Sequence, residues 1–212
     1  MKEKIGILGS GEVAQSLARG FKTKGYDVRI GTRNPDKLAS FSREAGVPAG
    51  TFPAVAGHGE LVVLAVKGTA AASVLEMAGP AVSGKVVIDT TNPIADAPPD
   101  QGILRYFTEP NRSLMETLQE KHPTARFVKA WNSVGNALMV DPKLSGGPPT
   151  MFYCGNDAGA KAIVARILEE FGWRPEDIGG APGARALEPL CQLWCAPGFL
   201  RNDWSHAFKV LR

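Results

Sequence analysis

A glycine-rich loop near the start of the chain is the feature that most constrains its fold. Residues 5–8 form a short apolar run, residues 9–14 read G-x-G-x-x-A, and apolar side chains then recur at helical spacing. Gly9 permits a tight turn, Gly11 lets the backbone approach a pyrophosphate, and Ala14 lets helix and strand pack closely. In this strand-turn-helix context the motif predicts a dinucleotide site at a helix N-terminus, whose N–H groups bind phosphate. The alternative is an ordinary turn made of small residues.

The rest of the chain continues the alternation of apolar runs and helical segments. Such strands and helices indicate βαβ units, so we expect an α/β fold with a doubly wound, Rossmann-type parallel sheet. The continuously apolar run at residues 61–66 is typical of a strand covered on both faces. Further strands are expected at residues 27–30, 86–89 and 127–131.

Composition excludes several classes of protein. The 212 residues are 44% hydrophobic and 21% charged, a globular balance in a chain long enough for one large domain, or a domain and a small annex. The net charge of +3 comes without a dense Lys/Arg run, which disfavours nucleic-acid binding. There is no apolar stretch near the roughly 20 residues of a membrane helix, and no apolar signal-peptide core. Three cysteines fit neither a disulfide framework nor a zinc site, so a reducing cytoplasm is expected.

The second predicted strand ends in Gly31-Thr32-Arg33-Asn34, where the adenine ribose of a dinucleotide should lie. NAD sites usually place Asp or Glu here to bind the ribose 2′-hydroxyl. Arg33 can instead bind a 2′-phosphate bidentately, Thr32 can donate its hydroxyl, and Lys37 follows one helical turn later. The cofactor is therefore predicted to be NADP(H). The alternative is that Arg33 is a solvated surface charge.

Other candidate contacts follow strands whose carboxyl ends should meet at one edge of the sheet, where doubly wound folds bind ligands. The nicotinamide is expected across Ala65, Val66 and Lys67, with Val66 packing on it. Asn92 and Asn136 are expected nearby. A purely structural role is the alternative for each residue. The irregular, proline-containing segment at residues 92–110 is expected to be functional, because long loops inside compact domains usually are.

Glycine and proline at residues 146–149 divide the chain. Beyond them we expect a strand at residues 151–154, a helix, an edge strand at residues 174–178 and a final amphipathic helix. The predicted organisation is an NADP-binding Rossmann domain at residues 1–147 and a short C-terminal βαβα annex at residues 148–212. The annex would complete the acceptor pocket and form a dimer interface.

No constellation for acid–base, nucleophilic or metal catalysis is evident, so we predict no catalytic side chain and no metal ligand. The three histidines are scattered and are expected to be solvated. Cys191 and Cys195 share a predicted helical face with leucines and are expected to be core thiols. Lys129 is a possible proton donor, but a solvated strand-end lysine is the favoured interpretation.

The missing constellation is itself informative. A cofactor that carries the hydride requires only binding, orientation and electrostatics from the protein. Reduction of a carbonyl normally requires a general acid, whereas a second redox ring can take its proton from solvent. The pattern therefore favours hydride transfer from NADPH to a flavin-like acceptor.

Four segments together resemble a known family: G-I-L-G-S-G-E-V-A, I-G-T-R-N-P, V-I-D-T-T-N-P and V-K-A-W-N. They are similar to the NADP-dependent oxidoreductases of the deazaflavin coenzyme F420, over most of the chain. The resemblance implies hydride transfer between NADP(H) and the deazaflavin. The reductase domains of membrane-bound metalloreductases are similar too. One departure is the turn at residues 132–135, which reads N-S-V-G where the best-known deazaflavin enzymes carry a His-Thr-Ile-Pro-like turn.

By position, the resemblance implies three groups of contacts. They are the pyrophosphate loop at Ser10, Gly11, Glu12 and Val13, the 2′-phosphate site at Thr32, Arg33 and Lys37, and the nicotinamide contacts near Val66, Asn92 and Asn136.

Three functions stay open: a deazaflavin-linked oxidoreductase, a reductase of free flavin or of a metal–flavin pair, and a non-catalytic NADPH-binding sensor. An imine reductase or β-hydroxyacid dehydrogenase is disfavoured, because the residues after Gly147 are too few for a long helical second domain.

The segment from Leu187 to Leu200 is apolar on more than one side, which predicts a homodimer with Trp194 at the acceptor pocket. The alternative is a helix buried within its own subunit.

Overall fold

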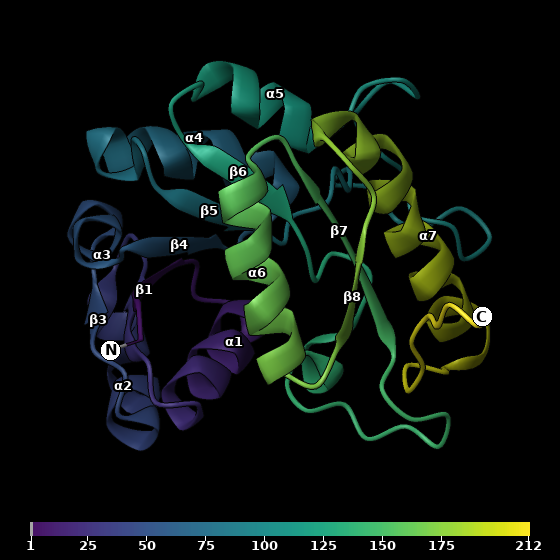
Figure 1. The fold of residues 1–212 in the computed structure, drawn as a ribbon, viewed down its shortest axis with the longest axis horizontal. Helices are drawn as coiled ribbons and strands as arrows, with labels where there is room; N and C mark the ends of the chain where they lie inside the picture. The colour runs from purple at the N-terminus through teal and green to yellow at the C-terminus, as the bar shows by residue number, and fades with distance from the viewer. Residues whose placement is uncertain (1) are drawn as a thin grey trace.

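An eight-stranded sheet runs through the computed structural model, which describes residues 2–212. Its strand order is β3-β2-β1-β4-β5-β6-β7-β8 (Figure 1). The strands are β1 Lys4–Leu8, β2 Asp27–Gly31, β3 Ala49–Gly50, β4 Leu61–Leu64, β5 Val86–Asp89, β6 Arg126–Lys129, β7 Thr150–Gly155 and β8 Arg174–Asp177. The helices are α1 Glu12–Thr23, α2 Ala39–Ala45, α3 Phe52–His58, α4 Gly68–Ala78, α5 Leu114–Lys121, α6 Ala158–Glu170 and α7 Ala184–Arg201.

The first six strands are parallel, and the strand order reverses at β1, which pairs with β2 on one side and with β4 on the other. Doubly wound sheets bind ligands outside the carboxyl ends of the strands at such a switch point. The glycine loop follows β1 directly, so it lies at this position. The predicted Rossmann-type fold is confirmed.

Strand β7 differs from the parallel pattern expected from the sequence. It pairs antiparallel with β6 and parallel with β8. The segment between β6 and β7 contains a short 3-10 turn, Asn136–Leu138, and no crossover helix of the kind that parallel neighbours need. The C-terminal elements β7, α6, β8 and α7 have the predicted βαβα order and extend the same sheet, with β8 as the predicted edge strand.

Helices cover both faces of the sheet, and each face has its own apolar core. Residues of α1, α2 and α6 form one core, and residues of α3, α4, α5 and α7 form the other (Figure 1). Strand β4 supplies both: Leu61 and Val63 belong to the first core, Val62 and Leu64 to the second. This alternation explains why the run is apolar at every position.

The segment between β5 and α5 folds back on itself. Isolated bridges pair Ile94 with Tyr106 and Asp100 with Ile103. We call residues 92–112 the pocket loop. It leads into Ser113, whose side chain forms a capping box with Glu116 at the start of α5. Within residues 2–212, no helix has the length and apolar character needed to cross a bilayer.

Candidate dinucleotide and acceptor site

The two glycines of the loop after β1 have different roles. Gly9 has a φ of +143°, donates its N–H to Gly31 O at 3.0 Å, and has no room for a side chain, because a Cβ would lie 2.0 Å from Ala65 O. A Cβ on Gly11 would have no heavy atom within 4 Å. The fold therefore requires glycine at position 9. At position 11 the chain leaves space beside the N-terminus of α1, which no side chain caps.

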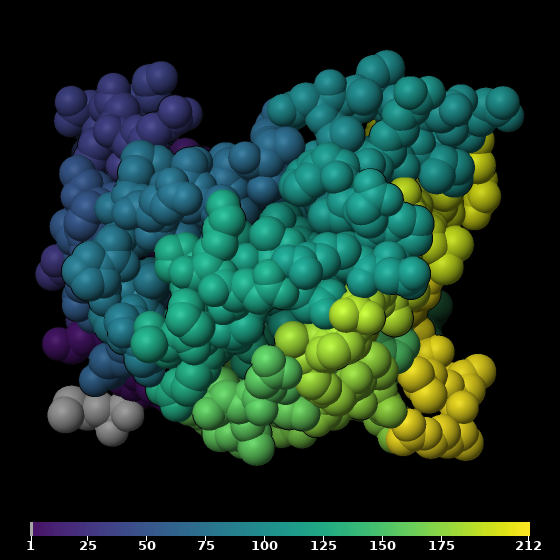
Figure 2. All heavy atoms as spheres, turned by 90° about the horizontal axis from the view of Figure 1, so that it is seen from above, coloured from purple at the N-terminus to yellow at the C-terminus, as the bar shows by residue number. Residues whose placement is uncertain are grey.

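The loop opens onto a groove with a volume of about 560 Å³. Figure 2 shows the N-terminal segments, purple to blue, and the teal loop after β5 as separate masses with a hollow between them. The groove brings together most of the residues predicted to bind the cofactor. It is lined by Ser10, Gly11, Glu12, Val13, Arg33, Ala65, Val66, Lys67, Ala70 and Thr90.

A smaller cavity of about 280 Å³ lies beside the end of β2, at the predicted 2′-phosphate position. Thr32 is buried there, whereas Arg33 is exposed and has no carboxylate partner within residues 2–212. Lys37 is exposed and lies outside the residues that line this cavity. Sequence reasoning missed the opposite wall, because no motif marks it. That wall consists of Thr51, Phe52, Pro53 and Met77.

A third cavity, of about 430 Å³, continues the groove past the end of β4. The two share Val13, Val66, Lys67 and Thr90. Beyond these residues the third cavity is lined by Gly68, Thr91, Asn92 and the stretch 94–97 of the pocket loop. Its two ionisable side chains pair with each other at the mouth, with Lys67 Nζ 3.4 Å from Asp96 Oδ1. Asn136 is not among the residues lining either cavity; it lies in the turn packed against α1.

Asn92 is held by a second asparagine below the cavity. It donates Nδ2–H to Asn132 O at 2.8 Å, and Asn132 Nδ2 donates to Asn92 Oδ1 at 3.1 Å and to Leu187 O at 2.7 Å. Asn132 is buried, and its Oδ1 atom has no hydrogen-bond partner among the described residues. These bonds fix the orientation of the Asn92 side chain at the end of β5.

Lys129 is fully buried, so the expectation of a solvated lysine was wrong. Its Nζ lies 2.8 Å from Asp89 Oδ2 and 2.9 Å from Glu188 Oε1, and it donates to Thr91 O at 2.7 Å. Burial alone lowers the pKa of Lys129, but the two carboxylates outweigh burial and raise that pKa above its usual value. Asp89 occupies the register position opposite Lys129 on β5. The matching positions of Asp89 and Lys129 at the ends of neighbouring strands could have indicated this pairing. No signal in the sequence indicates the contribution of Glu188 from α7.

One face of the C-terminal helix α7 is buried within its own subunit. Trp194 is 6% exposed, donates Nε1–H to His206 O at 2.8 Å and stacks on the His206 ring. Trp194, which the sequence predicts at the acceptor pocket, is not among the residues lining these two cavities. Leu193 and Leu200, in contrast, are 59% and 63% exposed.

The cysteines form no ligand set. Cys191 is buried, Cys195 is half-buried, and their Sγ atoms are 4.0 Å apart. Within residues 2–212, no group of three His, Cys, Asp or Glu side chains is arranged to hold a metal ion.

The fold, the glycine loop and the groove across the switch point define a dinucleotide-binding protein of the Rossmann class. Residues 4–93 match the family model described as NADP oxidoreductase, coenzyme F420-dependent. A crystal structure from Arthrobacter sp. FB24, classed with the F420-dependent NADP reductases, is 33% identical, with a TM-score of 0.93 and complete coverage of both chains. The chain belongs to the F420-dependent NADP oxidoreductase family.

Curated relatives are of two kinds. The F420-dependent NADP reductase of Methanocaldococcus jannaschii is 26% identical over 203 residues, which cover 90% of each chain. The metalloreductase STEAP3 of Rattus norvegicus is 28% identical over 197 residues, 88% of this chain and 36% of the relative. This chain thus spans little more than a third of the metalloreductases that it matches.

Proposed function

We propose that this protein is an NADPH-dependent oxidoreductase that transfers hydride between NADP(H) and the deazaflavin coenzyme F420. The observation that carries the proposal is one continuous groove. It runs from Arg33, past the glycine loop, to a cavity of about 430 Å³ at the ends of β4 and β5. Membership of the F420-dependent family supports the acceptor.

The residues present fit a bound NADP(H). The space at Gly11 accepts a pyrophosphate beside the N-terminus of α1, where the helix dipole favours an anion. Arg33 and Thr32 supply a guanidinium and a hydroxyl for the 2′-phosphate, and Lys37 adds a nearby positive charge. Gly9, Ser10, Glu12 and Val13 complete the proposed loop contacts. When bound, NADPH supplies the hydride.

The third cavity suits an acceptor that needs no acid from the protein. Its walls near Val66 and Asn92 carry neither histidine nor cysteine, and its ionisable pair, Lys67 and Asp96, is largely exposed. A deazaflavin ring takes up hydride as a unit and exchanges its proton with solvent, so binding and orientation suffice. The role proposed for Ala65, Val66 and Lys67 is to hold the nicotinamide against this acceptor.

A second candidate function is reduction of flavin or of a ferric flavin pair. The specific observation favouring it is the 28% identity to a metalloreductase over 88% of the chain. A non-catalytic NADPH sensor is the third possibility. It requires only the cofactor half of the groove.

The organisation expected from the sequence is also part of the proposal: NADP binding by residues 1–147, and an annex at residues 148–212 that forms the contact of a homodimer. The exposed Leu193 and Leu200 on α7 support a self-contact at this helix, in place of the buried Trp194. A cytoplasmic location is proposed because none of the three cysteines pairs in a disulfide.

Single-turnover oxidation of bound NADPH separates the candidates. The protein is mixed with stoichiometric F420, FMN, FAD or ferric chelate, and NADPH absorbance is followed in a stopped-flow instrument. The proposal expects fast oxidation with F420 and slow oxidation with the others. Preference for FMN or FAD would favour the second function, and tight NADPH binding without oxidation by any acceptor would favour the sensor.

A further inference from the structure

A buried charge cluster joins helix α7 to the floor of the site. It consists of Lys129, Asp89 and Glu188, whose side chains are at most 2% exposed. Lys129 Nζ donates to Thr91 O and forms ion pairs with Asp89 Oδ2 and Glu188 Oε1. Burying three charges destabilises the fold unless every one is compensated, and an apolar trio of the same volume is often no less stable. Stability alone therefore does not explain the cluster, and a further role is expected.

Glu188 also caps a helix from a distance. Its carboxylate accepts the N–H groups of Leu114 at 2.9 Å and Met115 at 3.1 Å, the first two residues of α5. The Ser113 side chain accepts the third, from Glu116 N. The positive end of α5 thus supplements Lys129 in balancing two carboxylates.

The cluster holds both ends of the pocket loop. At the first end, Asp89 Oδ1 accepts Thr91 N–H at 2.9 Å and the Thr91 hydroxyl at 2.7 Å, while Lys129 binds Thr91 O. At the second end, Glu188 binds the start of α5. A single group of three side chains therefore fixes the two points from which the loop leaves and returns.

Helix α7 also holds the middle of the loop. The Tyr106 hydroxyl donates to Glu188 O at 2.6 Å, and Gln192 Nε2 donates to Leu104 O at 2.7 Å. Tyr106 is paired with Ile94, one of the residues lining the third cavity. The hydrogen bond between Tyr106 and α7 therefore also restrains Ile94 in the cavity wall, across the loop.

We propose that Glu188 is a positioning residue that sets the place of the pocket loop and so the shape of the acceptor cavity. Its carboxylate acts through the buried charge cluster, and its backbone carbonyl acts through Tyr106. The consequence for catalysis rests on the proposed function, but the effect on the loop does not. No residue of α7 lines the groove between Arg33 and the glycine loop, so NADPH binding is expected to change little when the cluster is altered.

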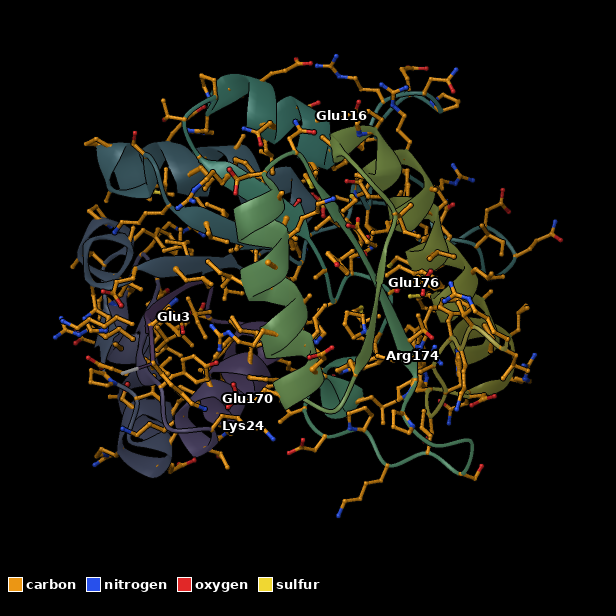
Figure 3. All side chains as sticks on the ribbon, in the orientation of Figure 1. Glu3, Lys24, Glu116, Glu170, Arg174 and Glu176 are labelled. Carbon is orange, nitrogen blue, oxygen red and sulfur yellow. The ribbon has the colours of Figure 1, made fainter. Side chains whose placement is uncertain are left out.

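The test compares Glu188→Gln and Tyr106→Phe with Arg185→Ala. Arg185 also joins α7 to α5, through the exposed pair with Glu116, and makes no contact with the cluster (Figure 3 shows Glu116 where the starts of α5 and α7 meet). Tyr106→Phe removes one hydroxyl and leaves every charge in place, so it remains informative if Glu188→Gln does not fold.

The first readout is hydrogen–deuterium exchange without ligands. The reporters are the amides of Ala95 and Phe107, which bond to Arg105 O and Pro93 O across the loop. Loss of a hydrogen bond at Glu188 should speed their exchange about tenfold, and Arg185→Ala should leave it unchanged. Unchanged exchange in both variants would overturn the proposal, whatever the enzyme reduces.

The second readout is steady-state kinetics. The variants should raise the KM for the acceptor about tenfold while the Kd for NADPH stays within about twofold. A merely structural role would change both together, and that result would overturn the proposal. A wild-type protein that oxidises no NADPH would refute the proposed function, and the exchange result would still decide the positioning role.

Discussion

Replacing Gly11 with valine is expected to abolish NADPH binding while the protein stays folded. Gly11 has φ −76° and ψ −178°, extended backbone that valine adopts readily. A Cβ there meets no heavy atom within 4 Å. The main cost to folding is the poor capping preference of valine at a helix start, about 1 kcal/mol. For a chain of this size that cost lowers Tm by roughly 2–4 °C.

The effect on the ligand is much larger. The valine side chain would fill the space between the glycine loop and the N-terminus of α1, where the pyrophosphate is proposed to lie. Each lost hydrogen bond between a backbone N–H and a phosphate costs about 1.5–3 kcal/mol. Losing two of them weakens binding on the order of 10² to 10⁴-fold.

The assay is a fluorescence titration with NADPH beside a thermal unfolding curve for each variant. Gly57→Val is the matched control, because a Cβ at Gly57 also meets nothing within 4 Å but Gly57 lies on α3, outside the groove. Gly9→Ala is the opposite control: with φ +143° and Ala65 O 2.0 Å from the new Cβ, it should destabilise the fold itself. Normal NADPH affinity in Gly11→Val would refute the reasoning.

Three further predictions follow from individual side chains. Arg33→Ala should weaken NADPH binding about tenfold or more and leave NADH binding unchanged, as measured by titration; equal wild-type affinities for the two cofactors would contradict the 2′-phosphate site. Hydrogen bonds from Arg185 lower the pKa of Glu116 from 4.5 to about 2, so this pair should stabilise the fold above pH 4.5 and lose its effect as the pH falls toward 2. Urea midpoints should show that loss in the wild type and a flatter profile in Arg185→Ala. Burial raises the pKa of Cys154 to about 12, whereas the hydrogen bond from Cys191 lowers that of Cys195. Mass spectrometry after brief iodoacetamide treatment should therefore find Cys195 alkylated and Cys154 unmodified.

Features encoded by neighbouring residues were predictable from the sequence. The glycine loop and the strand runs depend on contacts within a few positions, and each lies where its pattern indicates. The structure also distinguishes the two glycines of the loop, since a Cβ clashes at Gly9 and meets nothing at Gly11.

Features that depend on distant segments were not predictable. The sequence predicts that Lys129 is a solvated strand-end residue, whereas in the structure Glu188, on the last helix, pairs with its ammonium group. The sequence predicts Trp194 at the acceptor pocket of a homodimer, whereas in the structure the C-terminal segment folds back and His206 stacks on its ring. The antiparallel direction of β7 follows from a connection without a crossover helix, which periodicity alone does not reveal. In each case the sequence shows the type of residue or segment but does not show which distant segment packs against it.

The transfer of a labelled hydride tests the central claim most directly. NADPH deuterated at both C4 positions of the nicotinamide is mixed with the protein and oxidised F420, and the reduced acceptor is analysed by mass spectrometry. The proposed reaction predicts one deuterium per reduced F420, with none appearing when Gly11→Val replaces the wild type. Reduced F420 without the label, or no reduction of F420 while NADPH is bound, would contradict direct hydride transfer along this groove.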